Sequence, residues 1–261
     1  MRRTTMRVTT WSAAGLMALI AWTSAGRAAA AEINVLSAGA VRSVVSAVSE
    51  TFAKETGNLV KGTFGTVGVV RQKLAAGEPA DVIIATDVAI DELARQGAIV
   101  PGTRTDIARA GVGVGVREGA ARPDISTPEA FKQALLSAKS IVYVDPAQGA
   151  TSGIHFASVL QRLGIADAVK GKTLLWPGGY AAEAVADGRA ELVVHQISEI
   201  LPVKGVTLVG PLPKELQKIT IYSAGLATKA VSPEAARAFL GFLASPPIKE
   251  KFAAAGLDYR E

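Results

Sequence analysis

Cysteine is absent from the 261-residue chain, and histidine occurs only twice. Without cysteine there is no disulfide, no thiolate metal site, no cysteine nucleophile and no N-terminal cysteine that could carry a lipid. Two histidines are too few for the three or four nitrogen or sulfur ligands that a transition-metal site usually has. We therefore predict no metal and no cofactor.

A nucleophile-elbow motif of the form GxSxG is also missing. Asp145, Ser152, His155 and His195 contain the side chains of a Ser-His-Asp set, but nothing in their spacing fixes a catalytic geometry. We expect no catalytic residues and a protein that is not an enzyme. The alternative is a hydrolase or transferase that uses His155 or His195.

Long apolar runs are confined to the first 31 residues. This segment has a basic start, an apolar stretch from Trp11 to Trp22 and small residues from Ala28 to Ala31, which is the pattern of a secretory signal. The apolar stretch is too short for a membrane span. We predict a signal peptide over residues 1–31, removal after Ala31 and a periplasmic protein.

The excess of positive charge comes largely from this segment. The whole chain has 28 basic and 23 acidic residues, a net charge of +5. Residues 1–31 contain four arginines, Arg2, Arg3, Arg7 and Arg27, and no acid, so 28 − 4 leaves 24 basic against 23 acidic residues. A nearly neutral remainder does not favour nucleic acid as a partner.

From Glu32 onward, short apolar runs alternate with segments of helical spacing, which predicts an α/β fold with largely parallel strands. The expected strands are 33–36, 59–63, 81–85, 107–116, 141–144, 172–176, 191–196 and 219–228. The expected helices are 41–52, 69–76, 88–96, 128–137, 154–163, 181–186 and one that starts at 233.

Two of the expected strands are long, near 110–116 and 219–227, and they bracket the middle of the chain. We interpret them as crossings between two Rossmann-like lobes. The expected first lobe is residues 32–112 plus 224–261, and the expected second lobe is residues 113–223. Ligands of open α/β sheets bind at the carboxyl ends of strands, so two facing lobes would form a cleft that can close.

Four loops of small residues follow strands, at 37–40, 64–68, 145–153 and 177–180. Loops that lead into helices present unpaired backbone N–H groups, which favour an anion. Small residues also simply fit tight turns, so each loop alone is a weak signal. Together they provide hydroxyl donors at Ser37, Thr66, Thr151, Ser152 and Tyr180, and close backbone approach at Gly39, Gly68, Gly149, Gly153 and Gly179.

Arg42 lies one turn into the first expected helix. A positive charge at this place would suit a carboxylate better than a fully dehydrated oxyanion. The alternative is an arginine on the solvated surface.

Several motifs resemble those of the periplasmic molybdate-binding family, the solute receptors of ABC importers. They are INVLSAGAV, TFAKETG, FGTVG, AAGEPADVIIATD, DPAQGATSGI and FLGFLASP, and they extend over nearly all of the chain after residue 31. The resemblance implies a two-lobed type 2 periplasmic binding protein, a monomer, that captures a small anion and delivers it to the membrane subunits of an importer.

Members of this family hold molybdate or tungstate with serine hydroxyls, backbone N–H groups and one tyrosine. Matched motif by motif, the implied ligand-binding positions here are Ala40, Thr66, Val67, Ser152, Tyr180 and His195. Ala40 stands where the family has a serine, although Ser37 is close by, and His195 stands where it has the tyrosine. Two side-chain donors therefore depart from the molybdate pattern.

The identity of the anion stays open between two classes. A site of hydroxyl and amide donors without a fixed charge favours a tetrahedral oxyanion such as molybdate or tungstate. A site that contains His195, Arg42 and Tyr180 suits a small organic carboxylate of two or three carboxyl groups.

Overall fold

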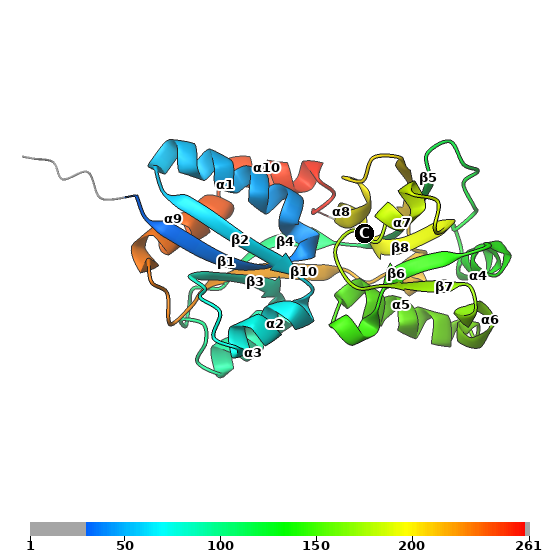
Figure 1. Ribbon diagram of the computed structural model, residues 1–261, viewed down its shortest axis with the longest axis horizontal. Coiled ribbons are helices and arrows are strands. Elements are labelled where there is room, and N and C mark those ends of the chain that lie inside the picture. The colour runs from blue at the N-terminus through cyan, green and yellow to red at the C-terminus, as the bar shows by residue number, and fades with distance from the viewer. Residues whose placement is uncertain (1–29, 259–261) are drawn as a thin grey trace, which may run out of the picture.

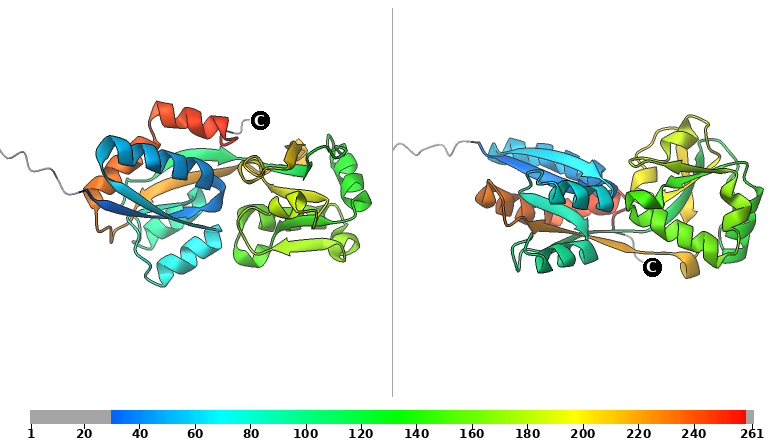
Figure 2. Two further views of the ribbon diagram at one scale, coloured as in Figure 1. Left: turned by 45° about the horizontal axis from the view of Figure 1, so that its top comes forward. Right: turned by 60° about the horizontal axis from the view of Figure 1, so that its bottom comes forward.

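The structure is a computed structural model that describes residues 30–258. It contains two α/β lobes, each built around its own five-stranded sheet (Figures 1 and 2), so the expected fold class is confirmed. The expected signal peptide falls outside the described residues except for its last two. No helix within residues 30–258 is long and apolar enough to cross a membrane.

The first lobe contains a sheet of strand order β2-β1-β3-β10-β4. Its strands are β1 (Glu32–Ala38), β2 (Leu59–Gly65), β3 (Val82–Thr86), β4 (Thr105–Ala110) and β10 (Thr220–Leu226). β1 pairs in parallel with β2 and β3, whereas β10 is antiparallel to β3 and β4. The helices are η1 (Gly39–Val41), α1 (Arg42–Thr56), α2 (Val67–Ala75), α3 (Asp87–Arg95), α9 (Pro233–Leu243) and α10 (Pro246–Ala254).

The second lobe repeats this plan with the strand order β7-β6-β8-β5-β9. Its strands are β5 (Val112–Arg117), β6 (Ile141–Val144), β7 (Thr173–Trp176), β8 (Leu192–Gln196) and β9 (Val206–Pro211). Its helices are α4 (Pro128–Ser137), η2 (Pro146–Gln148), α5 (Thr151–Arg162), α6 (Ala166–Lys170), α7 (Glu183–Ala186), α8 (Ile197–Ile200) and η3 (Lys214–Leu216). β6 is parallel to β7 and β8, and β5 is antiparallel to β8 and β9.

Each sheet buries apolar side chains on both faces, which is why the inner strands β3, β6 and β8 are rich in Val, Ile and Leu. In the first lobe, one cluster lies between the sheet, α1 and α9, with Phe52 packed edge-on against Phe239. A second cluster around Ile83 and Ile90 lies on the opposite face. The second lobe has the same two-sided arrangement, so each lobe has a hydrophobic core of its own.

The chain crosses between the lobes twice, but not within two long strands as expected. The first expected strand is divided at Gly111 into β4 of the first sheet and β5 of the second. The return crossing is complete before Thr220, because all of β10 lies in the first sheet. Val112 therefore belongs to the second lobe and residues 220–223 to the first, in contrast to the expected boundaries.

Candidate functional site

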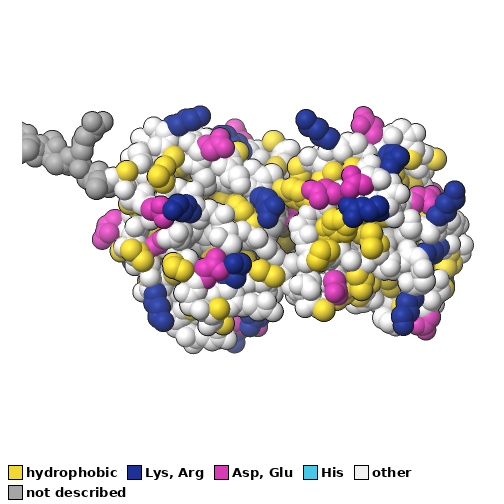
Figure 3. Space-filling model, viewed as in Figure 1, with side chains coloured by type: hydrophobic (Ala, Val, Ile, Leu, Met, Phe, Trp, Pro, Cys, Tyr) yellow, Lys and Arg dark blue, Asp and Glu magenta, His cyan; other side chains and the backbone are white. Residues whose placement is uncertain are grey.

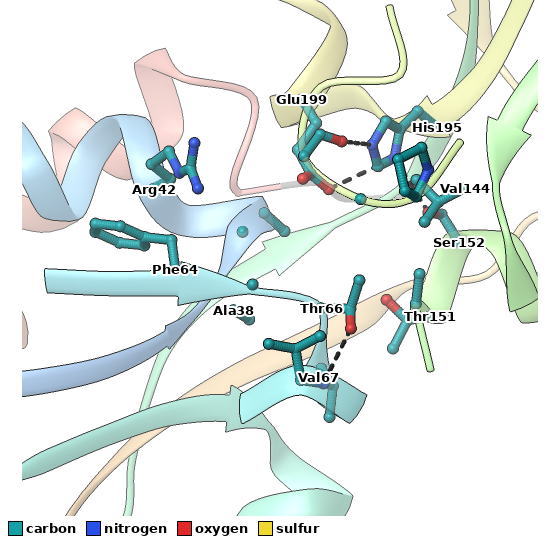
Figure 4. A pocket seen from close by; sticks show the side chains of 18 of the residues that line it. Ala38, Arg42, Phe64, Thr66, Val67, Val144, Thr151, Ser152, His195 and Glu199 are labelled. Atoms are coloured by element: carbon teal, nitrogen blue, oxygen red, sulfur yellow. Dashed lines mark hydrogen bonds and ion pairs between the residues drawn. The ribbon is translucent and has the colours of Figure 1, made fainter. Parts of the chain in front are cut away.

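A cavity of about 280 Å³ lies between the lobes, at the carboxyl ends of strands from both sheets (Figure 4). The space-filling view shows a notch where the lobes meet, with charges of both signs scattered over this face (Figure 3). The residues that line the cavity are Ala38, Gly39, Ala40, Arg42, Phe64, Gly65, Thr66, Val67, Val69, Val144, Ala150, Thr151, Ser152, Pro177, Gly178, Gly179, His195, Glu199 and Tyr222.

The first-lobe wall consists of the loops after β1 and β2. Gly39 and Ala40 belong to η1, and Thr66 and Val67 begin α2, so these four expected residues do line the cavity. The Thr66 hydroxyl caps α2 by accepting a hydrogen bond from the backbone N–H of Val69 (3.1 Å).

Ser37 is not part of this wall. Its side chain is fully buried within the first sheet, and its hydroxyl donates to the carbonyl of Ala38 (3.1 Å). Side chains alternate along β1, and that of residue 37 points toward the core of the first lobe. Ser37 was expected to offer its hydroxyl to an anion, and in the structure that hydroxyl does not reach the cavity.

The second-lobe wall is formed by the N-terminus of α5. Thr151 and Ser152 line the cavity there, as expected. The helix approaches β6 so closely that a Cβ atom at Gly153 would lie 2.0 Å from the carbonyl oxygen of Val144. Gly153 therefore positions α5 and does not contact the cavity.

His195 is the penultimate residue of β8 and lines the cavity with only 2% of its surface exposed. Its Nε2 lies 3.1 Å from the carbonyl oxygen of Gly179, which can only accept, so Nε2 carries a proton. Its Nδ1 accepts from the backbone N–H of Gln196 (2.9 Å) and lies 3.1 Å from the hydroxyl of Ser152. These contacts fit the neutral imidazole, with Nδ1 as an acceptor.

Glu199 lines the cavity one helical turn after His195 and was not among the expected site residues. It is 7% exposed, and its Oε2 lies 3.5 Å from Nδ1 of His195. Burial raises the pKa of the Glu199 carboxyl, while His195 and Arg42 act in the opposite direction. Burial therefore favours the protonated carboxyl beside a neutral imidazole.

Ser152 and Glu199 both approach the same nitrogen of His195, Nδ1. In a hydrolase triad the nucleophile and the acid contact opposite nitrogens of the imidazole. His155, the other candidate, does not line the cavity, because its Nε2 donates to the carbonyl of Leu216 (2.7 Å). The geometry therefore does not support the hydrolase alternative.

Arg42 lines the cavity and is not a surface arginine pointing into solvent. Its guanidinium carbon lies 5.2 Å from the ring centroid of Phe64 and 5.7 Å from that of Tyr180, which belongs to the other lobe. Among residues 30–258 it forms no hydrogen bond or ion pair. Tyr180 does not itself line the cavity but holds this arginine in place.

Gly68 and Gly149 lie outside the cavity and join the lobes beside it. The N–H of Gly68 donates to the carbonyl of Gly149 (3.3 Å), and the Thr66 hydroxyl donates to the carbonyl of Gln148. A Cβ atom at Gly68 would lie 2.6 Å from the Gln148 oxygen, and Gly149 has φ +67°. We call this contact of Thr66, Gly68, Gln148 and Gly149 the interlobe latch.

Tyr222 is a second residue that the sequence did not point to. It is fully buried on β10, and its hydroxyl lies 3.2 Å from that of Thr151 and 3.3 Å from Nε2 of Gln196. This network connects the sheet of the first lobe to the second lobe at the base of the cavity. Within residues 30–258 no cluster of three or more His, Asp or Glu side chains could hold a metal.

A two-lobed α/β protein with an anion-suited cavity between the lobes belongs to the class that captures small solutes by closing around them. Residues 33–258 match the model of a family described as bacterial extracellular solute-binding protein. The chain belongs to this family, whose members bind small ligands and work with membrane transporter subunits.

Two curated relatives carry different functional names. The chain is 33% identical over 231 residues to aconitate isomerase of Pseudomonas sp., covering 86% of this chain and 87% of that protein. It is 30% identical over 249 residues to a molybdate-binding protein of Azotobacter vinelandii, covering 92% and 95%. The solved periplasmic molybdate-binding protein of that organism has a TM-score of 0.74 at 21% identity, covering 88% and 100%. The resemblance to the molybdate-binding family is confirmed.

Proposed function

We propose that this protein is a periplasmic receptor for a small organic anion with two or three carboxylates, working as a monomer with the membrane subunits of an ABC importer. The observation that carries the proposal is Arg42, a guanidinium at the cavity wall, stacked between aromatic rings of both lobes and without an anionic partner among the described residues. The planar guanidinium of Arg42 can donate two parallel hydrogen bonds to the two oxygens of one carboxylate.

The rest of the cavity supports the same class of ligand. Its volume of about 280 Å³ is near the lower end of the ~300–1,000 Å³ of sites that hold small organic molecules. Ala40 provides no hydroxyl where a molybdate receptor has a serine. The name of the Pseudomonas relative adds support, because aconitate is an unsaturated tricarboxylate.

The donors around a bound carboxylate come from both lobes. Thr66 and the backbone of Gly39 and Ala40 belong to the first lobe, and Thr151 and Ser152 belong to the second. A ligand that contacts both walls stabilises the closed arrangement, since its binding energy depends on their being together.

A thermal-shift panel tests this function. A ligand at 100 times its dissociation constant stabilises the folded state by ~2.7 kcal/mol, which is ~5–11 °C for a protein of this size. We expect trans-aconitate, citrate or tricarballylate to produce such a shift, and molybdate, tungstate and sulfate to produce none. A shift with the oxyanions alone would contradict the proposal.

A second candidate function is isomerisation of the bound carboxylate. The identity to aconitate isomerase supports it, and the specific observation that favours it is the buried pair of Glu199 and His195 at the cavity wall. Such a pair can move protons, whereas a receptor needs none. Incubation with trans-aconitate and analysis by ¹H NMR would detect the cis isomer.

A further inference from the structure

We infer that Glu199 is the catalytic residue of a proton transfer at a carbon of the bound carboxylate, with His195 as its positioning residue; this inference rests on the ligand class proposed above. The two side chains lie 3.5 Å apart, both are at least nine-tenths buried, and both face the interlobe cavity (Figure 4).

The contacts of His195 leave one proton for the pair. Nε2 is committed to the carbonyl of Gly179, so only Nδ1 can exchange a proton with Glu199. The proton can lie on the carboxyl, giving Glu199-H and neutral His195, or on Nδ1, giving a carboxylate and an imidazolium, in which case the backbone N–H of Gln196 gives up its hydrogen bond to Nδ1. Both arrangements have the same net charge, so Glu199 can become a base without a change in the net charge of the buried site, and the two new charges lie next to each other.

Several other side chains surround the pair of Glu199 and His195. Arg42 of α1 and Tyr222 of β10 line the same cavity, Tyr180 of the fourth loop packs its ring against Arg42, and the Ser152 hydroxyl of α5 lies 3.1 Å from Nδ1. Gly39 of η1 lies so close that a Cβ atom there would be 3.0 Å from Oε1 of Glu199. The only formal charges among these groups are those of Arg42 and the pair itself.

The step itself needs no cofactor. The Glu199 carboxylate removes a proton from a carbon between a carboxyl group and a double bond, and the C–H electron pair is delocalised over the double bond and the carboxylate. Glu199 then returns the proton to the far carbon of the former double bond, so the double bond has moved by one position. During the step the pair carries one positive charge and the ligand one additional negative charge, and Arg42 faces the ligand's carboxylate.

The location of Arg42 makes this chemistry selective for carboxylates. Arg42 and Glu199 come from different lobes and line one cavity, so a carboxylate anchored on the arginine has its neighbouring carbon atoms enclosed beside the carboxyl. Glu199 and Arg42 are brought close to each other only when the lobes are closed.

The test uses the full-length mature protein with trans-aconitate as the probe, comparing binding by calorimetry with conversion to the cis isomer by ¹H NMR. Glu199→Gln has the shape and neutrality of the protonated acid, so we expect it to fold and to bind within about threefold of the wild type. Its conversion rate should fall by ~10²–10⁴-fold, the usual contribution of a general acid or base. The matched control is Glu183→Gln on the exposed face of α7, which should leave both values unchanged.

Two further variants separate catalysis from folding. Glu199→Asp retains a carboxyl group and should keep measurable conversion. His195→Gln should change the pH dependence of the rate, because it removes the group that takes the proton from Glu199, and a merely structural role would leave that profile in place.

These measurements distinguish failure of the inference about Glu199 from failure of the proposed receptor function. Binding without any conversion by the wild type, or unaltered conversion by Glu199→Gln, overturns this inference and leaves the receptor function standing. Failure of trans-aconitate and of every other carboxylate to bind overturns both.

Discussion

At the residue scale, the buried carboxyl of Glu199 is the feature that separates this site from one made only of hydroxyl and amide donors. Its pKa is raised chiefly by burial, so the folded state holds a proton that the unfolded chain releases. Where the unfolded state binds fewer protons than the native state, stability falls as pH rises. This group therefore costs stability above about pH 4.3, the ordinary pKa of a glutamate.

Replacing Glu199 by Gln should remove this cost, because an amide has the shape of the protonated acid and does not titrate. Below about pH 4 we expect equal free energies of unfolding for the variant and the wild type. Above that pH the variant should become relatively more stable, until the pH passes the raised pKa of the folded state. Urea unfolding at a series of pH values measures this, and a constant difference across the series would show that Glu199 is charged in the native protein.

His155 gives a second pH effect of the opposite sign. Its pKa is lowered, first by burial, although its hydrogen bond to the Leu216 carbonyl acts the other way. Its contribution to stability should be lost as pH falls below about 6.5, the ordinary pKa of histidine, because the unfolded chain then takes up the proton more readily. His155→Gln should flatten the stability profile between about pH 5 and 6.5 without altering ligand binding, since the residue does not line the cavity.

At the scale of elements, the interlobe latch connects the first turn of α2 to the loop before α5. Gly68 and Gly149 were expected to approach an anion with their backbone, but in the structure they approach each other. Gly68 has an ordinary helical place in α2, so alanine is compatible with its own helix and clashes only across the lobes. Alanine at position 68 should therefore affect only the closing of the two lobes against each other.

We predict that Gly68→Ala weakens ligand binding by ~5–150-fold, the equivalent of ~1–3 kcal/mol for an overpacked contact, mainly through faster dissociation measured by stopped flow. Gly241→Ala is the matched control, because a Cβ atom there meets nothing within 4 Å and the residue also lies in a helix, α9. Equal effects of the two substitutions would exclude the latch as a closing contact.

The sequence predicted most of the elements, because the strands are short buried runs and the helices have clear apolar spacing. It did not predict β9, α6, α8 or α10. α8 has only four residues, too few for a periodic pattern, and α10 begins with a pair of prolines, Pro246 and Pro247, that looks like the end of the preceding helix. β9 is half-buried along nearly its whole length, so it lacks the alternation of buried and exposed residues that indicates a strand.

The site could be predicted only in part. Thr66, Thr151, Ser152 and His195 follow from loops at strand ends, where small and polar residues have a recognisable pattern. Glu199 could not be found in this way, since an acidic residue is normally on the solvated surface and its burial depends on the opposite lobe. Its spacing four residues after His195 was the one available signal.

At the scale of the whole molecule, two separately folded lobes are connected by two short crossings, at Gly111 and at residues 217–219. The polar contacts between the lobes include the latch, the Tyr222 network and the packing of Arg42 on Tyr180. The second-lobe helix α8 also lies close to Gly39 and Gly256 of the first lobe. Such an interface permits rigid-body opening, with the hinge at the crossings.

We therefore expect ligand to make the molecule more compact. Small-angle X-ray scattering should show a smaller radius of gyration with a saturating carboxylate than without it, and Gly68→Ala should reduce the difference. Identical scattering curves with and without bound ligand would contradict the hinge.

The central claim is that Arg42 anchors a carboxylate between the lobes, and calorimetric titration with trans-aconitate tests it most directly. Loss of a charge-assisted hydrogen bond of ~1.5–3 kcal/mol predicts that Arg42→Gln binds ~10–150-fold more weakly than the wild type. The control is Arg237→Gln, an exposed arginine of α9 that should retain full affinity. Unchanged affinity in Arg42→Gln, or tight binding of molybdate that trans-aconitate does not displace, would contradict the account.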